Sequence, residues 1–307
     1  MVDYAYEMIR ENAGLPARFG SVRSFYTTFP AHWHEYVEII YLNSGHMTAV
    51  IQAEQYELSV GDILVINSDD IHMTRTAGEK TEYTLLQISP SQIAAFFPNL
   101  KQVRFATWIP AGKQMCAESA KLCREQNHDP SKDGILQKLL LEMKQIYEQK
   151  EDGYSLLFSA RLYEFLYLLY RDYARRLTLK DTSNNHRNFK QIVQVLEWAR
   201  EHYTEPLTIE EAAAYLGFSR EYFCRLFKKH TGQTFLSYVN ELRAMKLYED
   251  LKQSDQSIAV LMERHGITNY KVFLHTFRKL YGDTPQRVRS RTIQDRLSES
   301  LLTFLDE

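Results

Sequence analysis

The chain has 307 residues, 44% hydrophobic and 25% charged, with a formal net charge of −2 at pH 7. This length suits about two globular domains, and the ordinary composition argues against a disordered or collagen-like chain. The charge is uneven: residues 187–291 hold 17 of the 37 basic but only 12 of the 39 acidic residues. A basic C-terminal part joined to an acidic remainder is typical of a protein whose C-terminal part binds DNA.

The cysteines and the N-terminus indicate a compartment. Cys116, Cys123 and Cys224 have neither the pairing of a disulfide framework nor the spacing of a zinc site, so we expect reduced thiols. No basic start followed by an apolar core opens the chain, which argues against a signal peptide. The most apolar stretch, residues 154–170, contains charges and is too short to span a bilayer. We therefore expect a cytoplasmic protein with no membrane partner.

The first 110 residues or so predict β-strands. Aromatic and β-branched runs alternate with turn residues such as those at 43–45. The expected strands cover residues 36–42, 46–52, 56–60, 63–66, 72–76 and 82–88. Short strands at this spacing favour an antiparallel sandwich or a small barrel.

After Pro110 the periodicity becomes helical, with expected helices at 113–126, 135–150 and 154–175. The third is apolar on two sides, which needs two packing partners. One side carries Leu156, Ala160, Tyr163, Tyr167 and Tyr170, and the other carries Phe158, Leu162, Phe165 and Leu169. We expect the barrel to cover one side and a second copy of the chain to cover the other. The alternative is a helix central within one subunit.

Residues 182–188 are polar and predict a linker, placed at 179–188, after which Phe189 opens a helix. The segment that follows contains one pattern twice: a short helix, a glycine turn, then a helix with Arg and Lys among aromatics. The turn glycines, Gly217 and Gly266, lie 49 positions apart. Two helix-turn-helix units joined by a rigid amphipathic helix at 235–251 can enter successive major grooves about 34 Å apart. A basic helix can also be merely a solvated face, but its repetition in register argues against that reading.

Local signals set the ends of these helices. In the first copy, Thr208 and Glu211 fit a capping box, and Ser219 caps the second helix. In the second copy, Ser257 is the expected cap of the first helix and Thr268 of the second. Val260 stands where the box carboxylate would be, and Met262 occupies the place of Ala213.

The second helix of each unit divides into a buried and an outer face. We expect Tyr222, Phe223, Leu226 and Phe227 to be buried in the first copy, and Phe273 and Phe277 in the second. The outer faces hold side chains able to read bases or hold phosphates. The predicted DNA-binding residues are Ser219, Arg220, Glu221, Cys224, Arg225, Lys228 and Lys229 in the first copy, and Thr268, Asn269, Tyr270, Lys271, Leu274, His275, Arg278 and Lys279 in the second.

At these residues the chain resembles the AraC/XylS family of bacterial transcription regulators. The resemblance covers about 100 C-terminal residues and rests on Arg-Leu-Phe-Lys-Lys at 225–229, Phe-Arg-Lys at 277–279 and Gly-Asp-Thr-Pro at 282–285. It implies operator binding by both units, usually to activate transcription, with RNA polymerase as a further partner. Departures at Val260, Met262 and His265 suggest that the second unit contributes more to phosphate contact than to sequence choice.

A second constellation lies in the N-terminal part. His32, His34 and Glu38 would share one face of an extended strand, and His72 would arrive from a neighbouring strand. Two imidazoles and a carboxylate, with a third imidazole, are able to hold a divalent metal. The arrangement is similar to the cupin barrel, whose first motif has this spacing. The second cupin motif is only partly met, because Asn67 and Asp69 replace the usual Pro and Gly.

Relatives with a cupin-like sensor often keep such histidines as walls of a small-molecule pocket. Aromatic faces stack on sugar rings and amides fix hydroxyl groups. We therefore expect an organic effector, a carbohydrate or related metabolite, and keep two alternatives, a metal site and a purely structural role. The expected effector-binding residues are His32, Trp33, His34, Tyr36, Glu38, Tyr41, His72 and Gln87, and the alternative metal ligands are His32, His34, Glu38 and His72.

The sequence thus predicts an α+β chain of two domains. Its expected parts are a cupin-like effector-binding barrel (1–110), a helical dimerisation segment (111–178), a linker (179–188), an all-α double helix-turn-helix domain (189–291) and a tail (292–307). We expect a ligand-responsive, homodimeric transcription regulator, an activator rather than an enzyme, with no cofactor unless the metal site is used. The competing hypothesis is a metal-dependent cupin enzyme fused to a DNA-binding domain, although no second acid/base constellation is evident.

Overall fold

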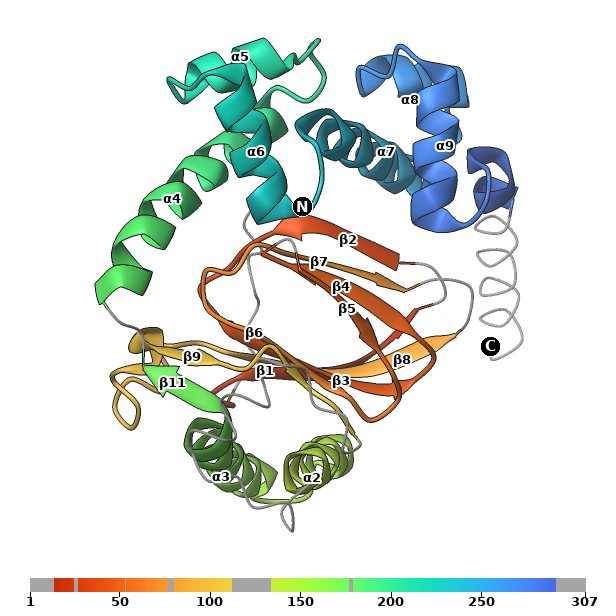
Figure 1. The fold of residues 1–307 in the computed structure, drawn as a ribbon. Coiled ribbons are helices and arrows are strands. Elements are labelled where there is room, and N and C mark those ends of the chain that lie inside the picture. Colours follow the sequence, from red (N-terminus) through yellow and green to blue (C-terminus); the bar gives the residue numbers. More distant parts are fainter. Residues whose placement is uncertain are drawn as a thin grey trace, which may run out of the picture.

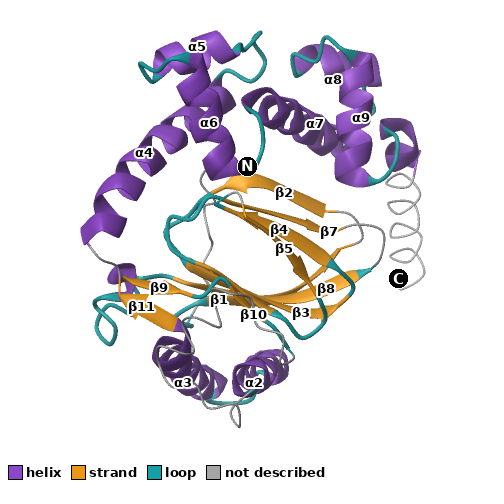
Figure 2. Cartoon of the chain, viewed as in Figure 1, coloured by secondary structure: helices purple, strands orange, loops and turns teal. Residues whose placement is uncertain are grey.

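A computed structural model of the chain describes residues 14–24, 27–52, 54–76, 80–111, 134–176 and 179–290. The expected helix at 113–126, the tail at 292–307, Cys116 and Cys123 lie outside these residues. In the described part, β-sheets form the middle of the molecule and helices cover them on two sides (Figures 1 and 2). None of the helices described is long and apolar enough to cross a membrane.

The N-terminal part consists of two facing antiparallel sheets, with strand orders β1-β8-β3-β6-β10 and β2-β7-β4-β5, and a small third sheet of β9 and β11. This confirms the predicted antiparallel β domain. The strands are β1 (Arg18–Ser24), β2 (Thr27–His32), β3 (Val37–Ser44), β4 (Met47–Ile51), β5 (Glu54–Leu58), β6 (Ile63–Ile66), β7 (His72–Thr76), β8 (Thr81–Ile88), β9 (Val103–Phe105), β10 (Trp108–Ile109) and β11 (Ala174–Arg176), and a short 3-10 helix spans Leu100–Gln102.

The five-stranded sheet is buried on both faces, which explains the nearly unbroken apolar run of β3. Ile40 and Leu42 point between the two sheets, where they meet Met47 of the opposite sheet. Ile39 and Tyr41 point to the other face, where they join the residues of the covering helices.

Helices α2 (Ile135–Gln149) and α3 (Tyr154–Tyr173) cover this outer face (Figure 1). The α3 residues Phe158, Leu162, Phe165 and Leu169 are buried, so this is the apolar side that packs within the domain. On the other predicted side, Leu156 is 78% and Tyr167 60% exposed. The helix ends two residues before the expected position, because the chain extends at Ala174 to pair with β9.

Helix α4 spans Leu179–Glu201 and differs from the prediction. We expected a linker at 179–188 and a helix from Phe189, whereas one helix covers both. No Gly or Pro occurs in this stretch to interrupt it. The polar composition of this stretch therefore does not mark an irregular connection.

The C-terminal part contains α5 (Ile209–Tyr215), α6 (Arg220–Thr231), α7 (Phe235–Gln253), α8 (Ile258–Arg264) and α9 (Tyr270–Tyr281). The pairs α5–α6 and α8–α9 are the two predicted helix-turn-helix units. Helix α7 is less one-sided than predicted, because Tyr238 packs with the first unit while Leu247 packs with the second. It therefore serves as a core element of both units and fixes their separation.

The C-terminal helices lie against the four-stranded sheet (Figure 1). Both α7 and α9 contact β2, and α6 contacts β4. Ala31 and Ile71 from the barrel belong to the same hydrophobic cluster as Phe227 of α6. The two halves thus share part of their packing.

Candidate functional site

The first helix-turn-helix unit is fixed by the predicted caps. The Thr208 hydroxyl accepts from the Glu211 backbone N–H at 3.1 Å, and the Glu211 carboxylate accepts from the Thr208 N–H at 2.9 Å. These hydrogen bonds lower the pKa of Glu211. Gly217 adopts a φ of 69° at the turn, and Ser219 accepts from the Tyr222 N–H at 3.3 Å to start α6. The chain direction into α6 is therefore set locally.

Helix α6 presents a basic outer face. Phe223, Leu226 and Phe227 are buried as predicted, but Tyr222 is 39% exposed. Its ring packs edge-on against Phe218 at the surface, with 4.8 Å between the ring centroids. The exposed side chains include all those predicted to contact DNA from this unit: Ser219, Arg220, Glu221, Cys224, Arg225, Lys228 and Lys229.

The second unit corrects one predicted cap. Ser257 caps α8 as expected, but α9 is capped by Asn269, whose side-chain oxygen accepts from the Val272 N–H at 3.1 Å. The expected cap, Thr268, lies one residue outside. Because both residue types can cap, the choice depends on where the chain enters the helix.

The outer face of α9 is only partly free for DNA. The exposed predicted residues are Thr268, Asn269, Tyr270, Lys271, His275, Arg278 and Lys279, whereas Leu274 is half-buried. Lys279 donates to the buried carboxylate of Glu241 on α7 at 2.9 Å. Lys279 and the helix cap Asn269, two of the predicted DNA contacts, therefore already make hydrogen bonds within the protein.

Sequence reasoning missed a polar connection between the two units. The Tyr203 hydroxyl lies 3.1 Å from His265 Nδ1, and His265 Nε2 lies 3.2 Å from an Asp250 oxygen. Burial lowers the pKa of His265, although Asp250 partly offsets this. Arg243 donates to the Tyr203 carbonyl at 2.7 Å. These residues are up to 62 positions apart, so no local pattern signals their contact.

In the barrel, the structure brings together three of the four predicted metal ligands. Their ligating nitrogens lie within 4.8 Å of one another, and all three side chains, those of His32, His34 and His72, are buried. His32 and His72 are register partners of β2 and β7, and their ring centroids are 4.0 Å apart. Glu38 lies outside this group, beside His34.

The prediction that His32, His34 and Glu38 share one strand is wrong. Strand β2 ends at His32 and β3 begins at Val37, so the residues between them carry the chain from one sheet to the other. His32 and Glu38 consequently approach from opposite sheets. The two residues meet because the chain crosses from one sheet to the other between them, and not because they alternate along one strand.

Hydrogen bonds connect the cluster to the five-stranded sheet. His34 Nε2 lies 2.9 Å from a Glu38 oxygen, and Gln87 donates to the same oxygen at 2.6 Å. Burial alone would raise the pKa of Glu38, but the hydrogen bond and charge of His34, with the charge of His72, lower it to about 2. Burial and the charges of the neighbouring histidines hold the pKa of His72 well below its usual range. The cluster thus contains an ionised carboxylate and a neutral imidazole.

The remaining predicted effector-binding residues lie in different places. Tyr36 is half-buried, with its ring edge-on to that of His34. Trp33 is half-buried and packs against the C-terminal cluster. Tyr41 does not reach the site, because it points from β3 toward α2 and α3 while Glu38 points between the sheets. The alternation of strand side chains places these two residues on opposite faces.

Asn67 and Asp69 hold the loop that leads to His72. The Asn67 side chain accepts from the Phe105 N–H at 2.7 Å and donates to the Phe105 carbonyl at 3.1 Å. Asp69 adopts a φ of 65°, the left-handed conformation that glycine takes most easily. The two departures from the cupin motif therefore serve the same turn with different residues.

A family model described as an AraC-like ligand binding domain matches residues 21–166, and one described as a helix-turn-helix domain matches residues 212–291. The chain belongs to the AraC family of transcription regulators.

Relatives of the AraC-family chain cover most of its length. The HTH-type transcriptional activator RhaS of Enterobacter sp. (strain 638) is 26% identical over 85% of this chain and 87% of that protein. The uncharacterized HTH-type transcriptional regulator YdeC of Bacillus subtilis (strain 168) is 24% identical over 83% and 84%. Among solved structures, ToxT from Vibrio cholerae is 11% identical, covers 89% of this chain and 98% of that one, and has a TM-score of 0.44.

These findings confirm the predicted family, the two-part fold and the function as a ligand-responsive, DNA-binding transcription regulator. The ligand-binding model extends past the barrel through most of α3. Barrel and covering helices therefore belong to the same ligand-binding domain of the AraC-family chain.

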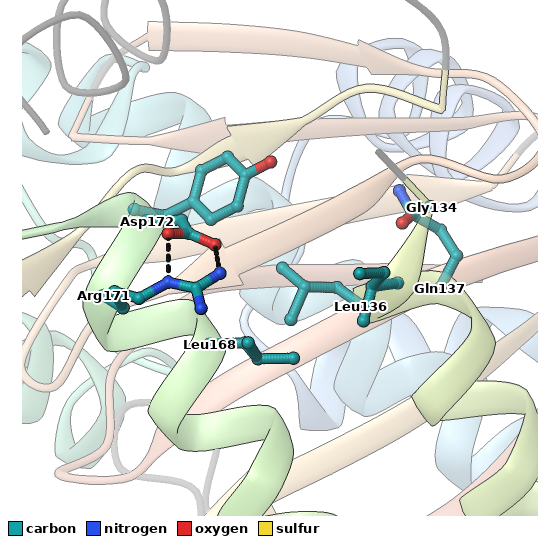
Figure 3. Close-up of a pocket in the computed structure, with 8 residues that line it drawn as sticks. Gly134, Leu136, Gln137, Leu168, Arg171 and Asp172 are labelled. Atoms are coloured by element: carbon teal, nitrogen blue, oxygen red, sulfur yellow. Dashed lines mark hydrogen bonds and ion pairs between the residues drawn. The ribbon is translucent and has the colours of Figure 1, made fainter. Parts of the chain in front are cut away.

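A shallow pocket lies elsewhere, between the start of α2 and the end of α3 (Figure 3). Gly134, Leu136 and Leu168 line it beside an ion pair in which Arg171 Nε donates to Asp172 at 2.6 Å. No predicted site residue lines this pocket, so it is separate from both candidate sites.

Proposed function

We propose that this AraC-family regulator reads its operator mainly through α6, while α9 contributes chiefly phosphate contacts. The supporting observation is the difference between their outer faces. On α6, Arg225 and Lys228 are exposed one turn apart, whereas on α9 Lys279 is paired with the buried carboxylate of Glu241. Each helix also uses one predicted contact, Ser219 or Asn269, as its cap. The two helices lie on either side of α7 (Figure 1).

Substitution of Arg225 tests this proposal. The operator sequence is first selected from a pool of random duplexes with the full chain. Arg225→Ala should then weaken operator binding by about 1–3 kcal/mol and relax the preference at one position. Lys228→Ala should weaken binding to all sequences and reduce the salt dependence by about one counterion. Arg161→Ala, on α3, is the control that should change neither. Equal loss on operator and random DNA would make Arg225 a phosphate contact.

We propose that the effector binds between the two sheets of the barrel, at the polar cluster formed by His32, His34, Glu38, His72 and Gln87, and that its organic component is a carbohydrate. In support, these groups offer buried donors and acceptors, and Tyr36 adds a half-buried aromatic face beside them. A panel of mono- and disaccharides should contain one that raises the melting temperature. Glu38→Gln should abolish this shift, while Glu57→Gln, on exposed β5, should retain it. A panel without any stabilising sugar would refute the carbohydrate assignment.

We propose that the regulator is a homodimer joined through the exposed side of α3, and that it acts in the cytoplasm as an activator in contact with RNA polymerase. The exposed apolar residues of α3 support the dimer, and the relative RhaS is named a transcriptional activator. The regulator names of the relatives also favour a non-enzymatic role over the cupin-enzyme alternative. As domains we propose residues 1–110 and 111–178 for sensing and dimerisation, and 189–291 for DNA binding, with 179–188 as a helical connection and 292–307 as a tail.

A further inference from the structure

Two of the three barrel histidines, His34 and His72, are oriented by backbone carbonyls. His72 Nδ1 donates to the Asp70 carbonyl at 2.8 Å, which leaves Nε2 with its lone pair toward the cluster. This buried Nε2 has no hydrogen-bond partner among the described residues. A buried polar atom without a partner is costly, and an imidazole fixed by its other nitrogen is the usual arrangement of a metal ligand.

His34 gives a second, independent indication. Its Nδ1 lies 3.1 Å from the Tyr36 carbonyl, an acceptor, so Nδ1 carries a proton. In the neutral ring, Nε2 then faces the Glu38 carboxylate at 2.9 Å with a lone pair. Two acceptors at this distance require a shared positive species. A proton on Nε2, as in an ion pair of His34 with Glu38, is one solution, and a metal ion on Nε2 beside the carboxylate is the other.

The same cluster is connected to the DNA-binding half. Gln52 donates to Asp70 Oδ1 at 3.1 Å, and its own side-chain oxygen lies 3.1 Å from Nδ1 of His230 in the last turn of α6. Arg104 holds both oxygens of Asp70 at 2.9 Å. One chain of contacts therefore runs from His72 through Asp70 and Gln52 to α6.

Apolar contacts follow the same path. Ala31 on β2 and Ile71, just before β7, precede His32 and His72 and, by the alternation of an extended chain, face the opposite way. Both apolar residues join the hydrophobic cluster of α6 and α7. The two strands thus carry histidines on the inner face and the domain contact on the outer face.

We propose that His32, His34 and His72, with Glu38 beside His34, bind a divalent transition-metal ion, and that its binding controls the contact between the barrel and α6. Imidazole suits zinc, copper, nickel and iron among the common metals. Three protein nitrogens leave coordination positions open, as in metal sites that accept a further ligand. Hydroxyl oxygens of the proposed effector can occupy them.

Movement of His72 provides the link. In a tetrahedral zinc site with bonds of about 2.1 Å, the ligating nitrogens lie roughly 3.4 Å apart. The three nitrogens, now within 4.8 Å of one another, must close toward that distance. Because Asp70 holds the His72 ring and Gln52, this closure changes the position of Gln52 relative to His230. Metal then favours one arrangement of the two halves over the other.

Metal binding by the full chain is the first test. After treatment with a chelator, the protein is titrated with zinc chloride by calorimetry and with cobalt chloride by visible absorption. We expect one ion per chain and a cobalt spectrum typical of nitrogen ligands. His72→Gln and His32→Asn should each weaken binding at least about 100-fold, more than loss of an outer-shell partner does. The matched control is His46→Gln, because His46 is an exposed barrel histidine paired with Glu57.

The outcomes separate clearly. Circular dichroism of the variants after chelator treatment checks that they fold. One folded variant, either His72→Gln or His32→Asn, is enough for the test. Stoichiometric binding by the wild type and His46→Gln, with loss in a folded ligand variant, supports the site. Absence of binding in the wild type, or equal losses in ligand and control variants, overturns it.

Gln52→Ala tests the link, which rests on the proposed operator binding by α6. This substitution removes the contact between Asp70 and His230 without changing a ligand. Zinc should alter operator affinity of the wild type by at least about threefold. The variant should still bind zinc but no longer respond. An equal response in the variant overturns the link, whereas absence of operator binding in every sample refutes the proposed function and leaves the metal titration interpretable.

Discussion

At the scale of single residues, the two turn glycines show how one local pattern can meet two environments. Gly217 and Gly266 adopt similar positive φ values, 69° and 63°. A Cβ atom on Gly217 would meet nothing within 4 Å. On Gly266 it would collide with the carbonyl group of Thr204, with 2.7 Å to its carbon. Only the second glycine is required by a neighbouring backbone as well as by its own conformation.

We therefore predict unequal costs for the same substitution. Gly217→Ala should lower the free energy of unfolding by about 1–2 kcal/mol, the cost of a left-handed conformation for a residue with a Cβ. Gly266→Ala should cost roughly 1–3 kcal/mol more, because the Thr204 backbone must also move. Urea denaturation of the two variants measures the difference. Equal losses would show that the close approach of Thr204 to Gly266 imposes no constraint.

The sequence predicted residue roles well where a few neighbouring residues determine them. The caps Thr208, Ser219 and Ser257 were predicted correctly, since each acts on a backbone N–H three residues on. Tyr41 was grouped with Glu38, although the parity of the two positions on β3 places their side chains on opposite faces of the sheet. The hydrogen bond between Gln52 and His230 was beyond prediction, because the two residues are 178 positions apart.

At the scale of elements, α7 connects the two helix-turn-helix units. Its Asp250 accepts from Arg264 of α8 at 2.8 Å and contacts the buried His265. Tyr203, beyond the end of α4, contacts the same histidine. His265, one of the residues at which the sequence departs from the family pattern, therefore lies where α7, α8 and the end of α4 meet.

The lowered pKa of His265 predicts a loss of stability in mild acid. Above its ordinary value of 6.5 the imidazole is neutral in both states. Below 6.5 the unfolded chain binds a proton that the folded chain does not, so the free energy of unfolding falls with pH down to the folded-state pKa. Asp250 stays ionised in this window because its own pKa is lowered, and Lys246, Arg264 and Tyr203 complete the surroundings.

Unfolding between about pH 7.5 and 5.5 spans this window for a histidine. The wild type should lose stability across it, and His265→Gln should lose less, since glutamine does not titrate. His202→Gln, at an exposed histidine paired with Glu205, is the control and should match the wild type. A wild-type slope that persists in His265→Gln would assign the acid sensitivity to other histidines.

Element types were predictable from periodicity, whereas their ends were less so. Helix α4 begins ten residues before the predicted start, because polar composition resembles a loop even where nothing breaks the helix. The crossing from β2 to β3 was read as one strand, because positions 32, 34 and 38 are all even and would share one face of an extended chain. Both errors concern where an element begins or ends, which depends on the elements packed against it.

At the scale of the whole molecule, the packing of the two halves had no signal in the sequence. The double pattern predicted the DNA-binding units, and the strand runs predicted the barrel. Nothing in either pattern indicated that Ala31 and Ile71 would pack against α6 and α7. Contacts between domains depend on the shapes of two finished surfaces, and single-sequence periodicity describes only one element at a time.

The exposed side of α3 is a surface for association between molecules that the sequence did indicate. Leu156, Leu157 and Tyr167 are 78%, 49% and 60% exposed on this helix. Phe96, 74% exposed, extends the apolar surface, and its ring centroid lies 5.0 Å from that of Tyr163. Large exposed apolar patches mark sites of association. A second copy would bury the same residues twice, as two-fold dimers do.

We predict that Leu156→Lys converts the proposed dimer to a monomer, because a charge on this surface would lose its hydration on association. The dissociation constant should rise at least about tenfold, equivalent to about 1.4 kcal/mol. Analytical ultracentrifugation of the full chain measures it. Val260→Lys on α8, an exposed aliphatic residue in the DNA-binding half, is the matched control and should remain dimeric. Since paired operator sites gain affinity from linked binding, Leu156→Lys should weaken binding to a two-site operator far more than to a single site. A monomeric wild type, or a dimeric Leu156→Lys, would place the dimer contact elsewhere.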